Sequence, residues 1–175
     1  MSWDGVSDTT CPIARGLSIV GERWTLLIMR ELNMGSRRFD DIQAQTGMSS
    51  HLLSLRLRQL EADGVIERRL PDNGSKRHEY YATQKGQELD RVLMAVRAWG
   101  LKWGEYGPDE EPATTLVYKE TGKPVRDNLM TFGDSDLERF AKTETVMSEA
   151  FSKERQRKLA AFKEAKSIKN AAAHA

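Results

Sequence analysis

The sequence contains few residues of the kinds that bind metals or form disulfides. Among its 175 residues there are one cysteine and three histidines. A single cysteine, Cys11, excludes a disulfide within the chain, and the histidines lack the spacing of a zinc site. We therefore expect neither a metal nor another cofactor.

Long apolar runs are also missing. A membrane-spanning helix needs roughly 20 consecutive apolar residues, and no stretch of the sequence approaches that length. Residues 1–5 show neither the basic start nor the apolar core of a signal peptide. We expect a cytoplasmic protein without membrane contact.

No catalytic arrangement is visible. Cys11 has no evident histidine partner, and no glycine-rich phosphate loop joins a strand to a helix. The paired Asp40 and Asp41 lie at a helix start, where carboxylates favour the helix dipole. We therefore expect that the protein is not an enzyme. The net charge of +1 leaves nucleic-acid binding open, because a duplex is recognised by a local patch of charge.

The length and composition indicate one well-buried domain with an appendage. The chain is 39% hydrophobic and 30% charged, which is ordinary for a globular protein. Apolar residues recur at helical spacing from Cys11 to Gly35 and are interrupted at residues 20–22. This pattern predicts two consecutive helices, the second ending at residues 33–35.

The next segment predicts two helices joined by a tight turn. A short helix carries Phe39 and Ile42 inward and ends at Gly47, because glycine readily adopts the left-handed conformation of such a turn. Ser49 is a favourable N-cap for the following helix. Three residues of that helix share its inward face: Leu53, Leu57 and Leu60. Its outward face is polar and basic apart from Leu55.

Two short strands are predicted after Gly64, at residues 65–69 and 78–82, around a turn at residues 71–74. Basic residues lie on both flanks of this turn: Arg68, Arg69, Lys76 and Arg77. The order of elements is that of a helix-turn-helix followed by a wing. The predicted fold class is α+β, mainly α.

The carboxy-terminal half predicts a long helix and an extension. Thr83 is expected to cap the long helix, whose apolar stripe includes Leu89, Val92, Leu93, Val96, Trp99 and Trp103. An acidic linker follows at 105–113, then an extension at 114–170. This extension is expected to contain a hairpin about Thr121 and Gly122 and a helix starting at a Ser135–Glu138 capping box, continuing through Phe140 and Met147 to Phe162. Residues 171–175 are expected to be disordered.

Several short motifs follow one another along residues 11–103. They lie at residues 11–15, 21–28, 38–39, 54–57 and 63–66, and at Thr83 with residues 85–86. Together they resemble the HxlR family of bacterial winged-helix transcription regulators. The resemblance implies a homodimer that binds palindromic operator DNA through paired recognition helices and wings, with residues 1–104 as the DNA-binding and dimerisation domain. Leu55 departs from the family, which usually has a polar residue there, and the tail is longer than in compact members.

The expected DNA contacts lie on the recognition helix and the wing. Candidates to reach bases or phosphates are Arg38, Ser49, Ser50, His51, Ser54 and Arg58, and the alternative is a solvated helix face. Leu55 is a candidate to contact a thymine methyl group, or else its own core or partner. Phosphate contacts are expected from Arg69, Lys76 and Arg77. Arg56 points closer to the inward face, and we expect it to have an internal hydrogen-bonding or backbone-positioning role rather than to read bases.

The apolar stripe exceeds what one small winged helix can cover, so it is expected to be buried between two subunits. The expected dimerisation residues are Ile13, Leu17, Val96, Trp99 and Trp103.

Cys11 is a candidate sensor of an oxidant or a small electrophile. Pro12 suits the first helical position, which makes Cys11 the N-cap, where the helix dipole stabilises a thiolate. Some HxlR relatives sense oxidants at this position. The alternative is a cap residue with no redox role.

Two functions therefore remain open. The first is a DNA-binding transcriptional regulator. The second is a winged-helix module that binds protein or RNA through its acidic linker and basic tail.

Overall fold

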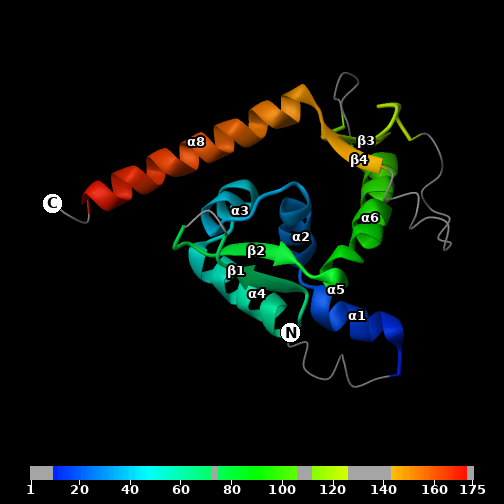
Figure 1. Ribbon diagram of the computed structural model, residues 1–175, viewed down its shortest axis with the longest axis horizontal. Coiled ribbons are helices and arrows are strands. Elements are labelled where there is room, and N and C mark those ends of the chain that lie inside the picture. The colour runs from blue at the N-terminus through cyan, green and yellow to red at the C-terminus, as the bar shows by residue number, and fades with distance from the viewer. Residues whose placement is uncertain (1–9, 72–74, 106–111, 126–142, 173–175) are drawn as a thin grey trace. The chain divides into compact units, whose positions relative to one another are not determined.

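The computed structural model describes residues 10–71, 75–105, 112–125 and 143–172 (Figure 1). The chain forms two compact units, Met1–Asp90 and Arg91–Ala175. The fold is α+β and mainly α, with the helix-turn-helix and wing that the sequence predicts.

The first unit begins with the two expected helices, α1 (Pro12–Val20) and α2 (Thr25–Asn33). Cys11 is the N-cap of α1 and Pro12 is its first residue, as predicted. The backbone N–H of Gly21 closes α1 by donating to the Leu17 carbonyl at 2.7 Å. No residue of α1 is buried, whereas α2 is central to the core.

The predicted turn between helices α3 (Phe39–Thr46) and α4 (Ser50–Ala62) is confirmed. Gly47 has a φ of +72°, the left-handed conformation in which a side chain is strained. Ser49 caps α4, because its hydroxyl accepts a hydrogen bond from the Leu52 backbone N–H at 3.3 Å. These local signals fix both where α4 starts and its angle to α3.

The core of this unit lies between α2, α3, α4 and the first strand. Its fully buried apolar residues are Ile28, Met29, Leu32, Ile42, Leu53, Leu57, Leu60, Val65 and Ile66. The three leucines of α4 are thus all buried, which leaves the opposite side of the helix toward solvent.

A buried charge shapes the loop that follows α2. Glu31 is fully buried, and its carboxylate accepts hydrogen bonds from Arg30 at 2.8 Å and from the Ser36 hydroxyl at 3.2 Å. Buried carboxylates need such partners, because their desolvation is costly. The Glu31–Ser36 contact holds the loop that leads into Arg37 and Arg38.

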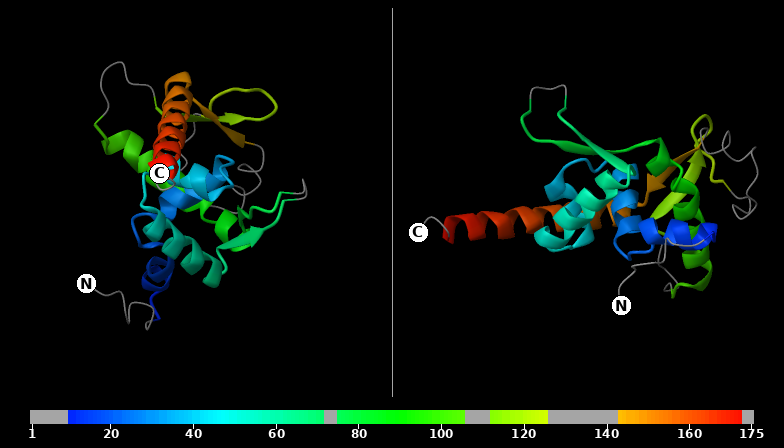
Figure 2. Two further views of the ribbon diagram at one scale, coloured as in Figure 1. Left: turned by 90° about the vertical axis from the view of Figure 1, so that its left-hand side faces the viewer. Right: turned by 90° about the horizontal axis from the view of Figure 1, so that it is seen from below.

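The wing consists of β1 (Ile66–Arg69) and β2 (Glu79–Ala82), which pair antiparallel with Ile66 opposite Ala82 and Arg69 opposite Glu79. Figure 2 shows these strands and their flanking segments projecting from the helices of the same unit. The end of β2 leads into a helical turn, α5 (Gln84–Gln87), capped by Thr83.

The prediction of a single long helix after Thr83 is wrong for the first residues of that helix. The chain forms α5 and then, after a break at residues 88–89, a separate helix α6 (Asp90–Trp103). Gly86 lies so close to β1 that an added Cβ would be 2.2 Å from the Val65 carbonyl oxygen. The Lys85 ammonium donates to the Asp63 carbonyl at 2.7 Å. These contacts hold α5 against residues 63–65, which join α4 to β1.

The second unit contains β3 (Thr114–Tyr118), β4 (Thr143–Met147) and α8 (Glu149–Ala172). β3 and β4 pair antiparallel with Thr114 opposite Met147. Arg97 of α6 donates to the Thr114 hydroxyl at 3.3 Å and to the Thr114 carbonyl. A turn does form about Thr121 and Gly122, where the Gly122 N–H donates to the Tyr118 carbonyl at 2.8 Å.

The prediction of a helix that runs through Met147 is wrong for residues 143–147, because these residues form β4. β-branched residues in this segment, among them Thr143 and Val146, favour a strand, and β3 provides its partner. α8 begins after Ser148, whose hydroxyl accepts from the Phe151 N–H at 3.2 Å. Residues 135, 138 and 140 of the expected helix lie outside the described residues.

Within the described ranges, no helix has both the length and the apolar character needed to cross a membrane. The same ranges contain no group of three or more histidine, cysteine, aspartate or glutamate residues that could hold a metal ion.

Candidate nucleic-acid interface

The outward face of α4 carries the residues expected to read DNA. The exposed members are Ser49, Ser50, His51 and Arg58, and Ser54 is half-buried. Leu55 is 45% exposed, so it is not a core residue of its own subunit. The Arg58 guanidinium makes one long hydrogen bond, 3.4 Å to the Ser54 carbonyl. Since burial of the leucine face fixes the rotation of the helix, these side chains form one surface, which is polar and basic apart from Leu55.

Arg56 differs from its neighbours on α4, because it points into the protein as predicted. Its Nη2 lies 2.5 Å from Oε1 of Glu22, and its side chain is 21% exposed. Glu22 belongs to the segment between α1 and α2. The Glu22–Arg56 ion pair therefore connects α4 to the segment between α1 and α2. Sequence reasoning did not assign a role to Glu22.

The wing arginines of β1 are engaged by carboxylates. Arg68 lies 3.9 Å from Glu61, and Arg69 forms an ion pair with Glu67. The Arg69 guanidinium also lies 5.4 Å from the centre of the Tyr81 ring. The wing therefore positions Arg69 while partly neutralising its charge.

The wing cations that precede β2 are less constrained. Lys76 and Arg77 are exposed, and neither side chain has an ion-pair partner within the ranges that the structure describes. Their charges are the most available in the wing for a phosphate group.

Arg38 lies at the N-cap position of α3 and joins this helix to the wing. Its Nε is 3.4 Å from Oε1 of Glu79 on β2, and Oε2 of Glu79 accepts from the Tyr81 hydroxyl at 2.8 Å. This hydrogen bond to a carboxylate is the main reason why the pKa of Tyr81 is raised. Arg38 is 49% exposed, so its guanidinium faces both Glu79 and solvent.

Cys11 is exposed and forms no disulfide. Its position at the N-cap of α1 is the one expected for the candidate sensor.

Apolar residues proposed for dimerisation are exposed on two helices. On α1, Ile13 is 71% and Leu17 is 42% exposed; on α6, Val96 is 51% and both Trp99 and Trp103 are 63% exposed. Neither helix contains a buried residue. Each helix thus presents an apolar face that its own unit leaves uncovered.

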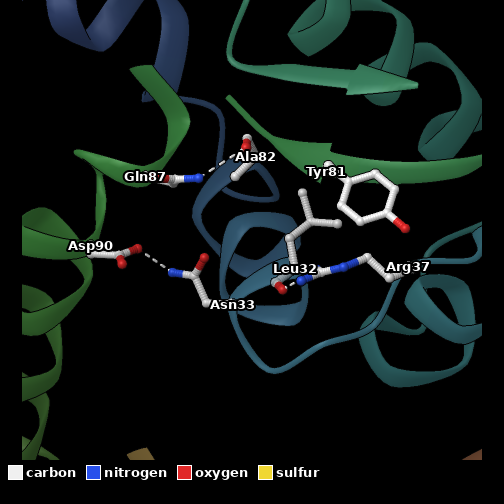
Figure 3. Close-up of a pocket in the computed structure, with 7 residues that line it drawn as sticks. All are labelled: Leu32, Asn33, Arg37, Tyr81, Ala82, Gln87 and Asp90. Atoms are coloured by element: carbon white, nitrogen blue, oxygen red, sulfur yellow. Dashed lines mark hydrogen bonds between the residues drawn. The ribbon is translucent and has the colours of Figure 1, made fainter. Parts of the chain in front are cut away.

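A small cavity, which the sequence did not reveal, lies behind the wing (Figure 3). It has a volume of about 250 Å³ and is lined by Leu32, Asn33, Arg37, Tyr81, Ala82, Gln87 and Asp90. The Asn33 amide donates to the Asp90 carboxylate. Burial raises the pKa of Asp90, and the Asn33 hydrogen bond opposes this effect.

Comparisons with known proteins agree with this geometry. Residues 19–108 match the family described as HxlR-like helix-turn-helix. An uncharacterized HTH-type transcriptional regulator of Mycobacterium tuberculosis is 39% identical over 119 residues, which cover 67% of this chain and 73% of the relative. The HTH-type transcriptional regulator YodB of Bacillus subtilis is 32% identical over 104 residues, 58% of this chain and 93% of YodB.

Solved structures share the fold. PA1607, which is described as a proposed transcription factor, is 33% identical to this chain in sequence, and the two structures superpose with a TM-score of 0.64. The match covers 74% of this chain and 88% of PA1607. The redox regulator HypR in its oxidized form is 26% identical with a TM-score of 0.50, covering 55% of this chain and 100% of HypR.

Proposed function

This chain is a transcriptional regulator that belongs to the HxlR-like helix-turn-helix family, and on that premise we propose that it binds a palindromic DNA operator as a homodimer. The observation that carries the proposal is the surface of α4. One side of α4 is anchored by buried leucines and by the Glu22–Arg56 pair, and the other side is exposed, polar and basic.

In this proposal α4 enters the major groove, which is wide enough for one helix. The short hydroxyl side chains near its amino end, Ser49, Ser50 and Ser54, approach bases or phosphates together with His51. Arg58 reaches a guanine or a phosphate. Leu55 contacts either a thymine methyl group or the partner subunit, because 45% of it is exposed.

The wing contributes contacts that do not depend on base sequence. Lys76 and Arg77 bind phosphates directly, since no carboxylate among the described residues holds them. Arg38 and Arg69 have to share their charge with Glu79 and Glu67. Their contribution to affinity is therefore smaller than that of the free cations.

The experiment that tests operator binding is selection of bound duplexes from a random pool by the full-length protein. A palindromic consensus supports recognition by a symmetric dimer. Retained duplexes without any shared sequence contradict specific binding. The variants Arg58→Ala and Arg77→Ala distinguish this function from a protein- or RNA-binding module: both weaken duplex binding if DNA is the partner, and neither does so if the module binds something else.

Homodimerisation rests on the uncovered faces of α1 and α6. Burying an exposed tryptophan between two copies removes on the order of 100 Å² of apolar surface, worth about 2–3 kcal/mol at about 25 cal/mol per Å². We expect Trp99→Ser to weaken the dimer at least tenfold in sedimentation equilibrium. Lys123→Ser, a change at an exposed lysine of the same unit that removes no large apolar group, serves as the control. An equal dimer constant for Trp99→Ser and the unaltered protein contradicts the assignment.

We further propose that Cys11 controls operator binding through modification of its thiol. The support is its exposed N-cap position and the similarity to HypR, which is named a redox regulator. With one thiol per chain, any disulfide that forms joins two subunits or captures a small thiol. Operator binding should respond to diamide in the unaltered protein and not in Cys11→Ser. The same response in both proteins excludes a sensor at Cys11.

A further inference from the structure

The cavity behind the wing combines a fixed cation, a carboxylate and an aromatic wall. All seven lining residues belong to the unit Met1–Asp90. Leu32 and Asn33 come from the end of α2, Arg37 from the loop before α3, Tyr81 and Ala82 from β2, and Gln87 from α5. Figure 3 shows Arg37 and Asp90 on opposite sides, with Leu32 and Asn33 between them.

Arg37 is held in position but retains unused donors. Its Nη1 donates to the Leu32 carbonyl and, at 3.4 Å, to the Ser36 carbonyl. The guanidinium lies 5.1 Å from the centre of the Tyr81 ring. Nε and Nη2 have no hydrogen-bond partner among the described residues, and neither is buried. A fixed guanidinium whose Nε–Nη2 edge is free is suited to a carboxylate, which that edge binds through two parallel hydrogen bonds.

The opposite side of the cavity offers acceptors. The Asp90 carboxylate accepts one hydrogen bond from Asn33, which leaves its other oxygen for a donor. The Gln87 amide nitrogen donates to the Ala82 carbonyl at 3.4 Å, so its side-chain oxygen is also available. Leu32, Ala82 and the Tyr81 ring also line the cavity, with the ring on the same side as Arg37 (Figure 3).

We propose that this cavity binds a small aromatic acid that carries a second polar group. The ligand carboxylate pairs with Nε and Nη2 of Arg37, its ring lies against the apolar wall, and a hydroxyl or amino group donates to Asp90. The cavity volume of about 250 Å³ is below the roughly 300–1,000 Å³ of pockets for drug-sized molecules. A single-ring metabolite is therefore the appropriate size class.

The same residues connect the cavity to the wing. The Tyr81 ring contacts Arg37 from the cavity and Arg69 from β1. Its hydroxyl binds Glu79, the ion-pair partner of Arg38. A ligand that draws Arg37 away from Tyr81 therefore changes the environment of two proposed DNA contacts. This regulatory part rests on the proposed function, whereas ligand binding itself does not.

Isothermal titration calorimetry of the full-length protein tests the binding site. The probes are 4-hydroxybenzoate, benzoate and the uncharged 4-hydroxybenzamide. We expect 4-hydroxybenzoate to bind most tightly and 4-hydroxybenzamide to bind at least tenfold more weakly, because it lacks the carboxylate. Arg37→Met keeps the aliphatic chain and should weaken 4-hydroxybenzoate binding at least tenfold. Arg23→Met is the matched control, since Arg23 also lies over an aromatic ring, at 5.2 Å from the centre of Trp24, but is outside the cavity.

A second variant keeps the test decisive if Arg37→Met does not fold. Asp90→Asn preserves the shape and the Asn33 hydrogen bond, and it should reduce the preference for 4-hydroxybenzoate over benzoate at least threefold. The proposal is overturned if the unaltered protein binds neither acid, if it binds the amide equally well, or if Asp90→Asn leaves the preference unchanged. The effect of 4-hydroxybenzoate on operator affinity is then measured separately, so a failure of DNA binding does not affect the result for the cavity.

Discussion

The salt dependence of operator binding provides a quantitative test of which cations contact phosphates. Each phosphate that a protein neutralises contributes about −0.9 to the slope of log affinity against log salt concentration. We count only the cations that have no carboxylate partner among the described residues and take Arg58 to contact a phosphate. Each protomer then makes three contacts, through Arg58, Lys76 and Arg77. A symmetric dimer therefore makes about six such contacts, which predicts a slope of about −5.4.

The perturbation is Arg77→Ala, which removes about two of these contacts from the dimer. The expected slope becomes about −3.6. Between 50 and 200 mM salt, the unaltered protein should lose affinity by about 2,000-fold and the variant by only about 150-fold. Arg69→Ala should change the slope less than Arg77→Ala does, because Arg69 already pairs with Glu67.

Fluorescence anisotropy with a labelled operator duplex measures these slopes, and circular dichroism checks that the variants are folded. Lys123→Ala removes an exposed lysine of the carboxy-terminal unit and serves as the control. The assignment of the wing would be refuted if Arg77→Ala bound with the slope of the unaltered protein, or if Lys123→Ala lowered the slope equally.

Three further predictions concern stability and the anchoring of α4. Gly86→Ala places a Cβ 2.2 Å from the Val65 carbonyl oxygen, so thermal unfolding should show a loss of about 2–3 kcal/mol. Glu22→Gln removes the carboxylate that holds α4, and urea unfolding should show a loss of about 1 kcal/mol together with weaker operator binding; unchanged values for both would contradict the anchoring role. Burial raises the pKa of Asp90 above its ordinary value of 3.8. The contribution of the protonated Asp90 carboxyl group to the free energy of unfolding is therefore complete below pH 3.8 and is lost as the pH rises through the folded-state pKa. Asp90→Asn should therefore unfold at an equal or higher temperature than the unaltered protein at pH 7, with the difference shrinking toward pH 3; a Tm well below that of the unaltered protein at pH 7 argues against this reasoning.

The sequence alone determined the helix-turn-helix and the wing, because their signals act over a few residues. Gly47 fixes a left-handed turn, Ser49 caps α4 with its own side chain, and leucines at helical spacing decide which face of α4 is buried. Where a local signal competed with a distant partner, the sequence prediction was wrong. Residues 143–147 were assigned to a helix, but pairing with β3 makes them a strand.

Only the tertiary structure decided what connects these elements. The ion pair between Arg38 and Glu79 joins residues 41 positions apart, and the hydrogen bond between Asn33 and Asp90 joins residues 57 apart. Neither side chain of such a pair has a periodicity or a local motif that identifies its partner. The cavity exists because the chain brings residues of α2, β2 and α5 together with Arg37 and Asp90. Local backbone chemistry therefore specified the surface proposed to read DNA, and long-range packing created the site proposed to regulate it.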